Sequence, residues 1–134
     1  MQDRYLFRAK RLDNGQWVQG FICKKKYKSN KFYISCFHDK DDNEQFFAID
    51  PDTICQCTGL KDKNGKLIWE NDIMVAHLDE DYPEDETYIR ILWCGNGFCS
   101  IENGSKDIAP IDKFDSEHFE VCGNIFDNAE LLEE

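Results

Sequence analysis

Apolar and polar side chains alternate with a period of two along most of this chain, and the 3.6-residue period of an amphipathic helix is nearly absent. In DRYLFRAKR (residues 3–11), aromatic or apolar side chains fall on one face and mostly basic ones on the other. Asn14-Gly15 then supplies the positive φ angles of a tight turn, and WVQGFI (residues 17–22) alternates again. The pattern predicts an N-terminal β-hairpin.

The same alternation predicts strands through the rest of the chain, bounded by turn-forming residues. The expected strands are residues 31–38, 45–50, 54–58, 67–70, 73–77, 87–93, 98–101, 108–114 and 118–126. Only DNAELLEE (residues 127–134) has a helical pattern, with Asp127 as the N-cap and Glu130 as its capping-box partner. We expect a mainly β protein that ends in a short helix, with Leu131 and Leu132 packed onto the β-structure.

A break in the pattern at Pro51 divides the chain, because proline cannot donate a hydrogen bond into a β-ladder. We therefore expect two parts, residues 1–52 and 53–134.

Charge is unevenly distributed along the chain: residues 1–57 hold ten Lys and Arg against eight Asp and Glu, a net +2. Residues 58–134 hold six against nineteen, a net −13, which would repel a nucleic-acid backbone.

TGLKDKNGKLIWENDIM (residues 58–74) concentrates turn-forming residues between very short strands. Asn64-Gly65 reverses the chain, and Asn71-Asp72 bends it again after a brief strand. Strands this short, with bends this sharp, suit a small coiled barrel better than a flat sheet. The Asp72 carboxylate is placed to accept backbone N–H groups of its own turn.

This motif resembles the signature of the YopX family, a group associated with phages and prophages. FRAKR (residues 7–11) is similar to the family's opening strand, and FEVCGNIFDNAELLEE (residues 119–134) resembles its closing segment. The chain departs from the family pattern at three positions. Asn71 stands where Gly is common, Ala129 where Pro is common, and Lys10 where Trp is common. Asparagine tolerates a positive φ angle, so we expect the turn at Asn71 to survive.

The resemblance implies a fold but no chemistry. It implies an SH3-type β-barrel with a short C-terminal helix in residues 53–134, preceded by a smaller β-rich part in residues 1–52. It brings no catalytic residues to carry over to this chain.

The chain has seven cysteines, and an odd number cannot all form disulfides within one chain. In a reducing cytosol the default expectation is free thiols packed as small apolar side chains. The alternative is a metal site drawn from the three histidines and Cys55, Cys57, Cys94, Cys99 and Cys122. Two strand cysteines one residue apart lie about 7 Å apart, which is wide for one zinc. Cys94 and Cys99, which flank the Gly-Asn-Gly turn, could face each other across a hairpin. We expect no metal and no cofactor.

Catalytic motifs are also missing from the pattern. His38, His77 and His118 each sit at a strand end beside acidic residues, and no G-x-S-x-G elbow occurs. The acidic run at 79–86 lacks the ordered spacing of a calcium loop. The basic run at 24–31, with Tyr27 within it, superficially resembles a nucleic-acid-binding strip. Its positive charge is small compared with the negative charge of the rest of the chain. We expect no enzyme activity, no catalytic residues and no direct nucleic-acid binding.

These observations favour a non-enzymatic phage or prophage accessory protein that acts by binding another protein, through residues that the sequence does not single out. The alternative is an acidic decoy that mimics nucleic acid and blocks a host nucleic-acid-binding protein. The N-terminus has no signal-peptide pattern and no run is long enough for a membrane helix, so we expect the bacterial host cytoplasm. Lys24–Lys31 meeting an acidic surface of a second copy would give a homo-oligomer.

Overall fold

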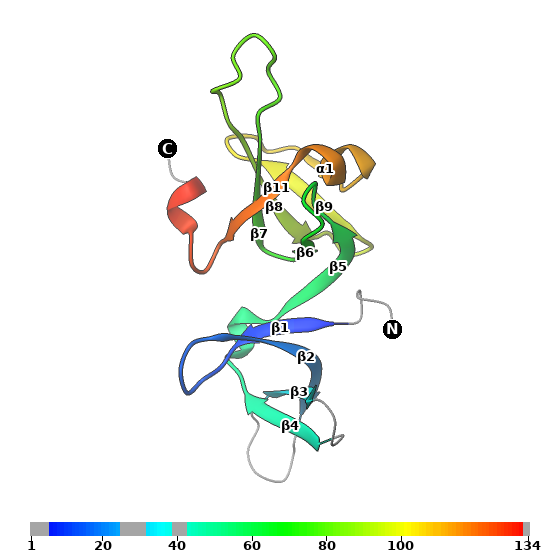
Figure 1. Cartoon of the computed structure of the whole chain (residues 1–134), viewed down its shortest axis with the longest axis vertical. Helices are drawn as coiled ribbons and strands as arrows, with labels where there is room; N and C mark the ends of the chain where they lie inside the picture. Colours follow the sequence, from blue (N-terminus) through cyan, green and yellow to red (C-terminus); the bar gives the residue numbers. More distant parts are fainter. Residues whose placement is uncertain (1–5, 25–31, 39–42, 133–134) are drawn as a thin grey trace. The chain divides into compact units, whose positions relative to one another are not determined.

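The computed structural model describes residues 6–24, 32–38 and 43–132 (Figure 1). Strands dominate and form two antiparallel sheets, which confirms the mainly β prediction. The chain divides into two compact units after residue 57. The reason is that Cys55 and Gln56 pair with Arg8 and Phe7, so the start of their strand belongs to the first unit.

The first unit is built from consecutive antiparallel hairpins. Its strands are β1 (Phe7–Lys10), β2 (Trp17–Lys24), β3 (Phe32–His38), β4 (Asn43–Ala48) and the start of β5 (Cys55–Lys61), in the order β4-β3-β2-β1-β5. The expected N-terminal hairpin is confirmed, with Ala9 opposite Val18 and a positive φ of 72° at Gly15. Ala9, Ile34 and Ile49 form a small buried core.

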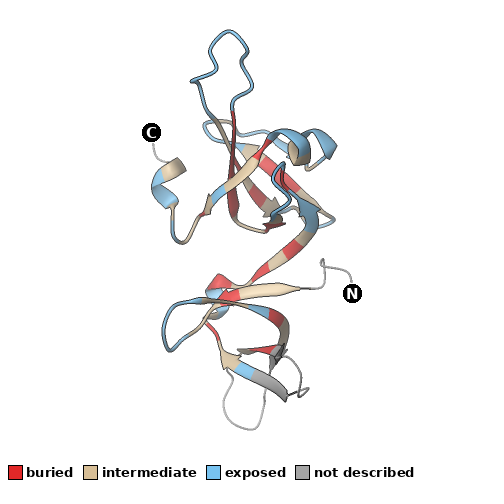
Figure 2. Cartoon of the chain, viewed as in Figure 1, coloured by how far each residue is buried: buried red, intermediate tan, exposed pale blue. Residues whose placement is uncertain are grey.

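The second unit is a five-stranded antiparallel sheet with a hairpin and one short helix. Its elements after β5 are β6 (Leu67–Trp69), β7 (Asp72–Ala76), β8 (Thr87–Trp93), β9 (Phe98–Glu102), β10 (Ile108–Pro110), α1 (Lys113–His118) and β11 (Glu120–Asn124). The sheet order is β10-β9-β8-β7-β11. The core consists of Ile68, Met74, Ala76, Ile89, Ile91 and Phe119, which are among the buried positions coloured red in Figure 2.

The motif at 58–74 forms the β5–β6 hairpin and the turn into β7. Gly65 and Asn71 take positive φ angles of 83° and 70°, which confirms both expected turns. Asp72 is almost fully buried, and its carboxylate accepts the backbone N–H of Trp69 at 2.8 Å. Asp62 is buried too and accepts three backbone N–H groups at 2.9 Å, two from its own turn and one from Val121 on β11.

The strand expected at 108–114 was wrong over its second half. β10 ends at Pro110, and α1 begins at Lys113. Asp112 and Asp115 form a capping box in which each carboxylate accepts the other residue's backbone N–H, at 3.0 and 3.2 Å. These capping hydrogen bonds stabilise a helical turn locally, and they outweigh the weak alternation of apolar and polar residues in this segment. No helix in the described ranges is long and apolar enough to span a membrane.

The expected terminal helix is a four-residue 3-10 turn, Ala129–Leu132. The segment before it is shaped by Asn124, whose side-chain oxygen accepts N–H groups from Phe126 and Asp127 at 2.9 Å. The closed barrel implied by the family resemblance is not detected, since no ladder among the described strands joins the sheet edges β10 and β11.

Candidate binding groove

The core face of the second unit's sheet continues beyond the core and forms an open groove. Directly opposed residues of an antiparallel pair point to the same face. Ile91, in the core, lies opposite Ser100, while Ile89 lies opposite Glu102. On the next strand, Ala109 lies opposite Ser100. These positions alternate along their strands, so they share one face of the sheet. Ile89, Ser100, Glu102 and Ala109 line a groove of about 360 Å³ on that face.

Apolar side chains supply much of the groove's lining. Ile89 and Phe119 belong to the hydrophobic core and are buried. Phe114 on α1 and Leu78 after β7 are 48% and 41% exposed, although both are large and apolar. Phe114 is held in place by its stacking on the His118 ring, with centroids 4.0 Å apart. The groove thus presents apolar surface that nothing in the described chain covers.

α1, which carries part of this lining, has a capped start and a hydrogen bond to β5. The Asp112–Asp115 capping box sets its start. The Ser116 hydroxyl donates to the main-chain oxygen of Lys61 at the end of β5. This contact ties the α1 wall to the end of β5.

The polar lining of the groove is acidic. Its charged members are Glu102, Asp107 and Asp115, and no Lys or Arg is among the lining residues that the structure describes. The Arg11–Asp13 and Lys113–Glu117 ion pairs involve none of them. Burial raises the pKa of Asp115 above its ordinary value, because the ionised carboxylate is partly removed from water. The groove's own lining therefore holds three carboxylates and no Lys or Arg, while Lys106 and Lys113 adjoin it in sequence beside Asp107 and Phe114.

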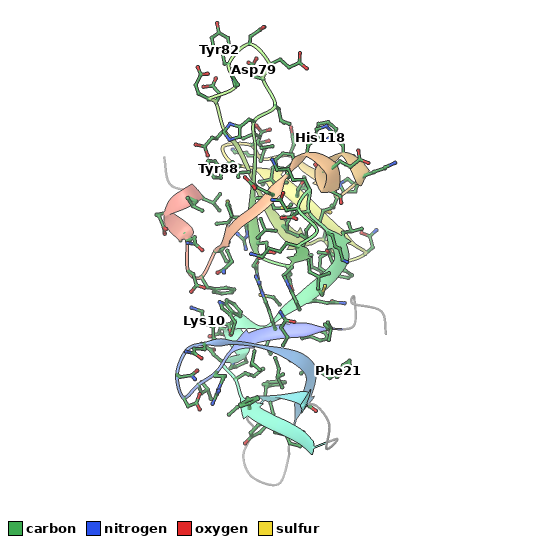
Figure 3. The ribbon with its side chains drawn as sticks, in the orientation of Figure 1. Lys10, Phe21, Asp79, Tyr82, Tyr88 and His118 are labelled. Carbon is green, nitrogen blue, oxygen red and sulfur yellow. The ribbon has the colours of Figure 1, made fainter. Side chains whose placement is uncertain are left out.

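The loop between β7 and β8 borders the groove and has its own hydrogen bonds. His77 Nδ1 lies 2.7 Å from the Pro83 carbonyl oxygen, and Asp79 accepts the backbone N–H groups of Asp81 and Tyr82. Figure 3 shows Asp79 and Tyr82 toward the far end of this loop. At its return, the Tyr88 hydroxyl donates to the Glu86 carboxylate at 2.5 Å, which raises the pKa of Tyr88 to about 12.

The first unit contains a hollow of similar size, about 440 Å³, with a different character. Its cation, Arg11, already pairs with Asp13 through two hydrogen bonds and lies over the Phe47 ring, 4.3 Å from the centroid. Because its charge is matched within the hollow, this site has less to offer a charged partner than the groove of the second unit.

The candidate metal ligands are dispersed among the described residues. Cys55 and Cys57 are fully buried in β5, as expected for core thiols. Cys94 and Cys99 do face each other: a hydrogen bond to Cys99 raises the pKa of the Cys94 thiol. Cys122 donates its thiol to the Ile73 carbonyl at 3.4 Å. No three His, Cys, Asp or Glu side chains in the described part of the chain gather as a metal-binding set.

The histidines are likewise separate. His77 contacts the Pro83 carbonyl, and His118 Nδ1 lies 2.9 Å from the Phe114 carbonyl (Figure 3). The side chain of His38 lies outside the described residues, as does the basic segment 25–31. Both described rings contact main-chain oxygens rather than a cysteine or carboxylate that they could activate.

Two comparisons with known proteins found a match to this chain. The family model described as YopX protein matches residues 6–133. This chain belongs to the YopX family. The crystal structure of protein EF1440 from Enterococcus faecalis resembles it with a TM-score of 0.56 at 24% identity, over 95% of this chain and 96% of that one. That likeness shows a shared fold. No curated protein matches the chain.

In this YopX chain the family motif and the groove are different regions. The 58–74 motif builds the β5–β6 hairpin, and none of its residues lines the groove. Sequence reasoning missed the groove because its lining comes from β8, β9, β10 and α1, which the chain brings together only on folding. One signal was available: Ser100 and Glu102 place polar side chains on the same face of β9 as Phe98.

Proposed function

We propose that this YopX protein is a non-enzymatic accessory protein of a phage or prophage that acts by binding another protein in the bacterial cytoplasm. The observation that carries the proposal is the groove of the second unit. It combines uncovered large apolar side chains, Phe114 and Leu78, with an acidic lining that lacks a described cation. Uncovered apolar surface with a charged border is typical of protein-binding sites.

Binding fits the groove's chemistry better than catalysis does. Its polar groups are carboxylates and hydroxyls, and no histidine or cysteine lies among its described lining. A nucleophile would need a neighbouring base, and the Ser100 hydroxyl has no histidine in this lining to supply one.

We also propose that the second unit is an SH3-type barrel in which the β5–β6 hairpin closes over the sheet. Three contacts of the hairpin turn with Phe119 and the start of β11 support this. Lys63 N–H donates to the Phe119 carbonyl at 3.1 Å, Asn64 Nδ2 donates to Glu120 at 3.0 Å, and Asp62 accepts the N–H of Val121.

The test is capture of a partner from host cells under infection, using the tagged full-length chain. Wild type should retain a specific protein, and Ala109→Arg, which places a long cation in the groove, should lose it. Asn96→Arg adds the same charge at the exposed β8–β9 turn and should retain it. Failure of wild type to capture any specific protein would contradict the proposed function.

The acidic decoy remains the second candidate, and the loop at 79–86 favours it. This loop places six carboxylates within eight exposed residues. A decoy would bind through this dense charge, so a loop variant with Glu80→Gln, Glu84→Gln and Asp85→Asn would lose its partner while Ala109→Arg kept it. The opposite pattern supports the groove.

A further inference from the structure

We propose that the groove of the second unit receives a partner-protein segment that inserts one large apolar side chain and places a Lys or Arg beside it. This inference rests on the proposed function and specifies the chemistry of its partner. The two halves of the recognition follow from different parts of the lining.

The apolar half follows from the sheet register. Ile89 and Phe119 form an apolar wall continuous with the core, and Phe114 extends it into solvent. At about 360 Å³ the groove lies near the lower end of the about 300–1,000 Å³ typical of ligand pockets, which suits a side chain or two rather than a whole folded surface. An aliphatic or aromatic side chain would cover the surface that the chain itself leaves bare.

The cationic half follows from the carboxylates. Glu102 ends β9, Asp107 precedes β10, and Asp115 lies on α1, so negative charge reaches the groove from three segments. Partial burial already disfavours the charged form of Asp115, so a nearby cation would be stabilising there. Phosphate groups and acidic peptides would be repelled by the same lining, which makes the groove selective by charge.

The Ser105–Asp107 turn keeps part of this charge in place. The Ser105 hydroxyl oxygen accepts the N–H of Asp107 at 3.1 Å, and both residues line the groove. Ser100, which is 8% exposed, adds a hydroxyl to the floor of the groove. A peptide main chain crossing the floor could use this hydroxyl as donor or acceptor.

The experiment is selection of a random 12-residue peptide display library against the immobilised full-length chain. The enriched peptides, synthesised with a fluorophore, are then titrated by fluorescence anisotropy. We expect a Leu, Phe, Trp or Met within two positions of a Lys or Arg. We expect Glu102→Gln with Asp107→Asn to weaken binding about tenfold, and Ala109→Arg to abolish it. Glu80→Gln with Glu84→Gln, the matched change outside the groove, should leave the affinity unchanged.

A charge swap separates a direct contact from a fold defect. Glu102→Lys should bind a peptide with its Lys changed to Glu better than it binds the parent peptide, while the wild type shows the reverse order. Each variant's thermal unfolding is recorded alongside. The inference would be overturned by any of three results. The library could yield no enriched peptide, the enriched peptides could lack the apolar–cationic pattern, or the groove variants could bind them as tightly as the wild type does. If cell capture still yields a partner in that case, the protein-binding function stands and only the groove's specificity is wrong.

Discussion

At the residue scale, two buried carboxylates explain why the 58–74 motif is rich in acidic and turn residues. Asp62 accepts the N–H groups of Asn64, Lys66 and Val121, and Asp72 accepts that of Trp69. A buried carboxylate is costly unless its oxygens are hydrogen-bonded, and here backbone donors at turns satisfy them. The Asp62 contacts also join the hairpin turn to β11.

Replacing Asp62 tests this role. Asp62→Ala leaves three backbone N–H groups without their acceptor, so we expect a loss of about 3 kcal/mol or more in the free energy of unfolding. Asp62→Asn keeps one acceptor oxygen and should cost less. Chemical denaturation followed by circular dichroism measures both. A loss below about 1 kcal/mol for the alanine variant would show that the contacts are not structural.

The Tyr88–Glu86 hydrogen bond gives a pH prediction. The carboxylate holds the proton on the phenol and raises the pKa of Tyr88 to about 12. Ultraviolet titration of wild type against Tyr88→Phe should reveal this late ionisation, and Glu86→Gln should return the pKa toward about 10. Because the folded pKa exceeds the unfolded one, the bond contributes stability below pH about 10, and this is lost as the pH rises through about 12.

The control for this titration is Glu84→Gln, which removes a carboxylate of the same loop without touching the hydrogen bond. It should leave the late ionisation in place. A Tyr88 pKa that does not respond to Glu86→Gln would refute the assignment.

At the element scale, the outcome depended on how strongly local chemistry specified each segment. Hairpins with a glycine or asparagine at the required positive φ, such as those at Gly15 and Gly65, formed where expected. α1 was missed because a helix of only six residues shows little helical periodicity. Its sequence signal is the Asp112–Asp115 capping box. Short elements carry their information in their ends rather than in their repeat.

Gly20 in β2 gives a sharp test at this scale. A Cβ built there would lie 2.1 Å from the main-chain oxygen of Ser35 and 2.8 Å from a methyl carbon of Ile34. Gly20→Ala must therefore separate β2 from β3, and we expect it to destabilise the first unit by about 3 kcal/mol. Gly97→Ala, where nothing lies within 4 Å, should have far less effect. Thermal unfolding of the two variants decides, and equal melting temperatures would contradict the packing.

At the scale of the whole molecule, the charge asymmetry coincides with the architecture. The division into units falls after residue 57, so the unit of residues 1–57 has a net charge of +2 and that of residues 58–134 has −13. We propose that the acidic unit of one copy attracts the Lys24–Lys31 segment of another. The attraction acts through solvent and is sensitive to salt.

If this attraction drives self-association, the apparent mass in solution should fall as salt rises. Raising ionic strength from 0.1 M to 1 M shortens the screening length from about 10 Å to about 3 Å. Analytical ultracentrifugation over this range measures the mass, with sucrose at matched osmolarity as the control. A monomer at every salt concentration would contradict self-association by this route.

The sequence by itself determined the strand content, the turns at Asn64-Gly65 and Asn71, the family and the uneven charge. All of these depend on residues close together in the chain, whose backbone preferences act locally. Only the tertiary structure decided the groove, because Ile89, Glu102 and Phe114 reach it from separate elements. It also decided the partners of Asp62, since Val121 lies far along the chain from it. Contacts between distant segments depend on strand order and register, which local alternation does not specify.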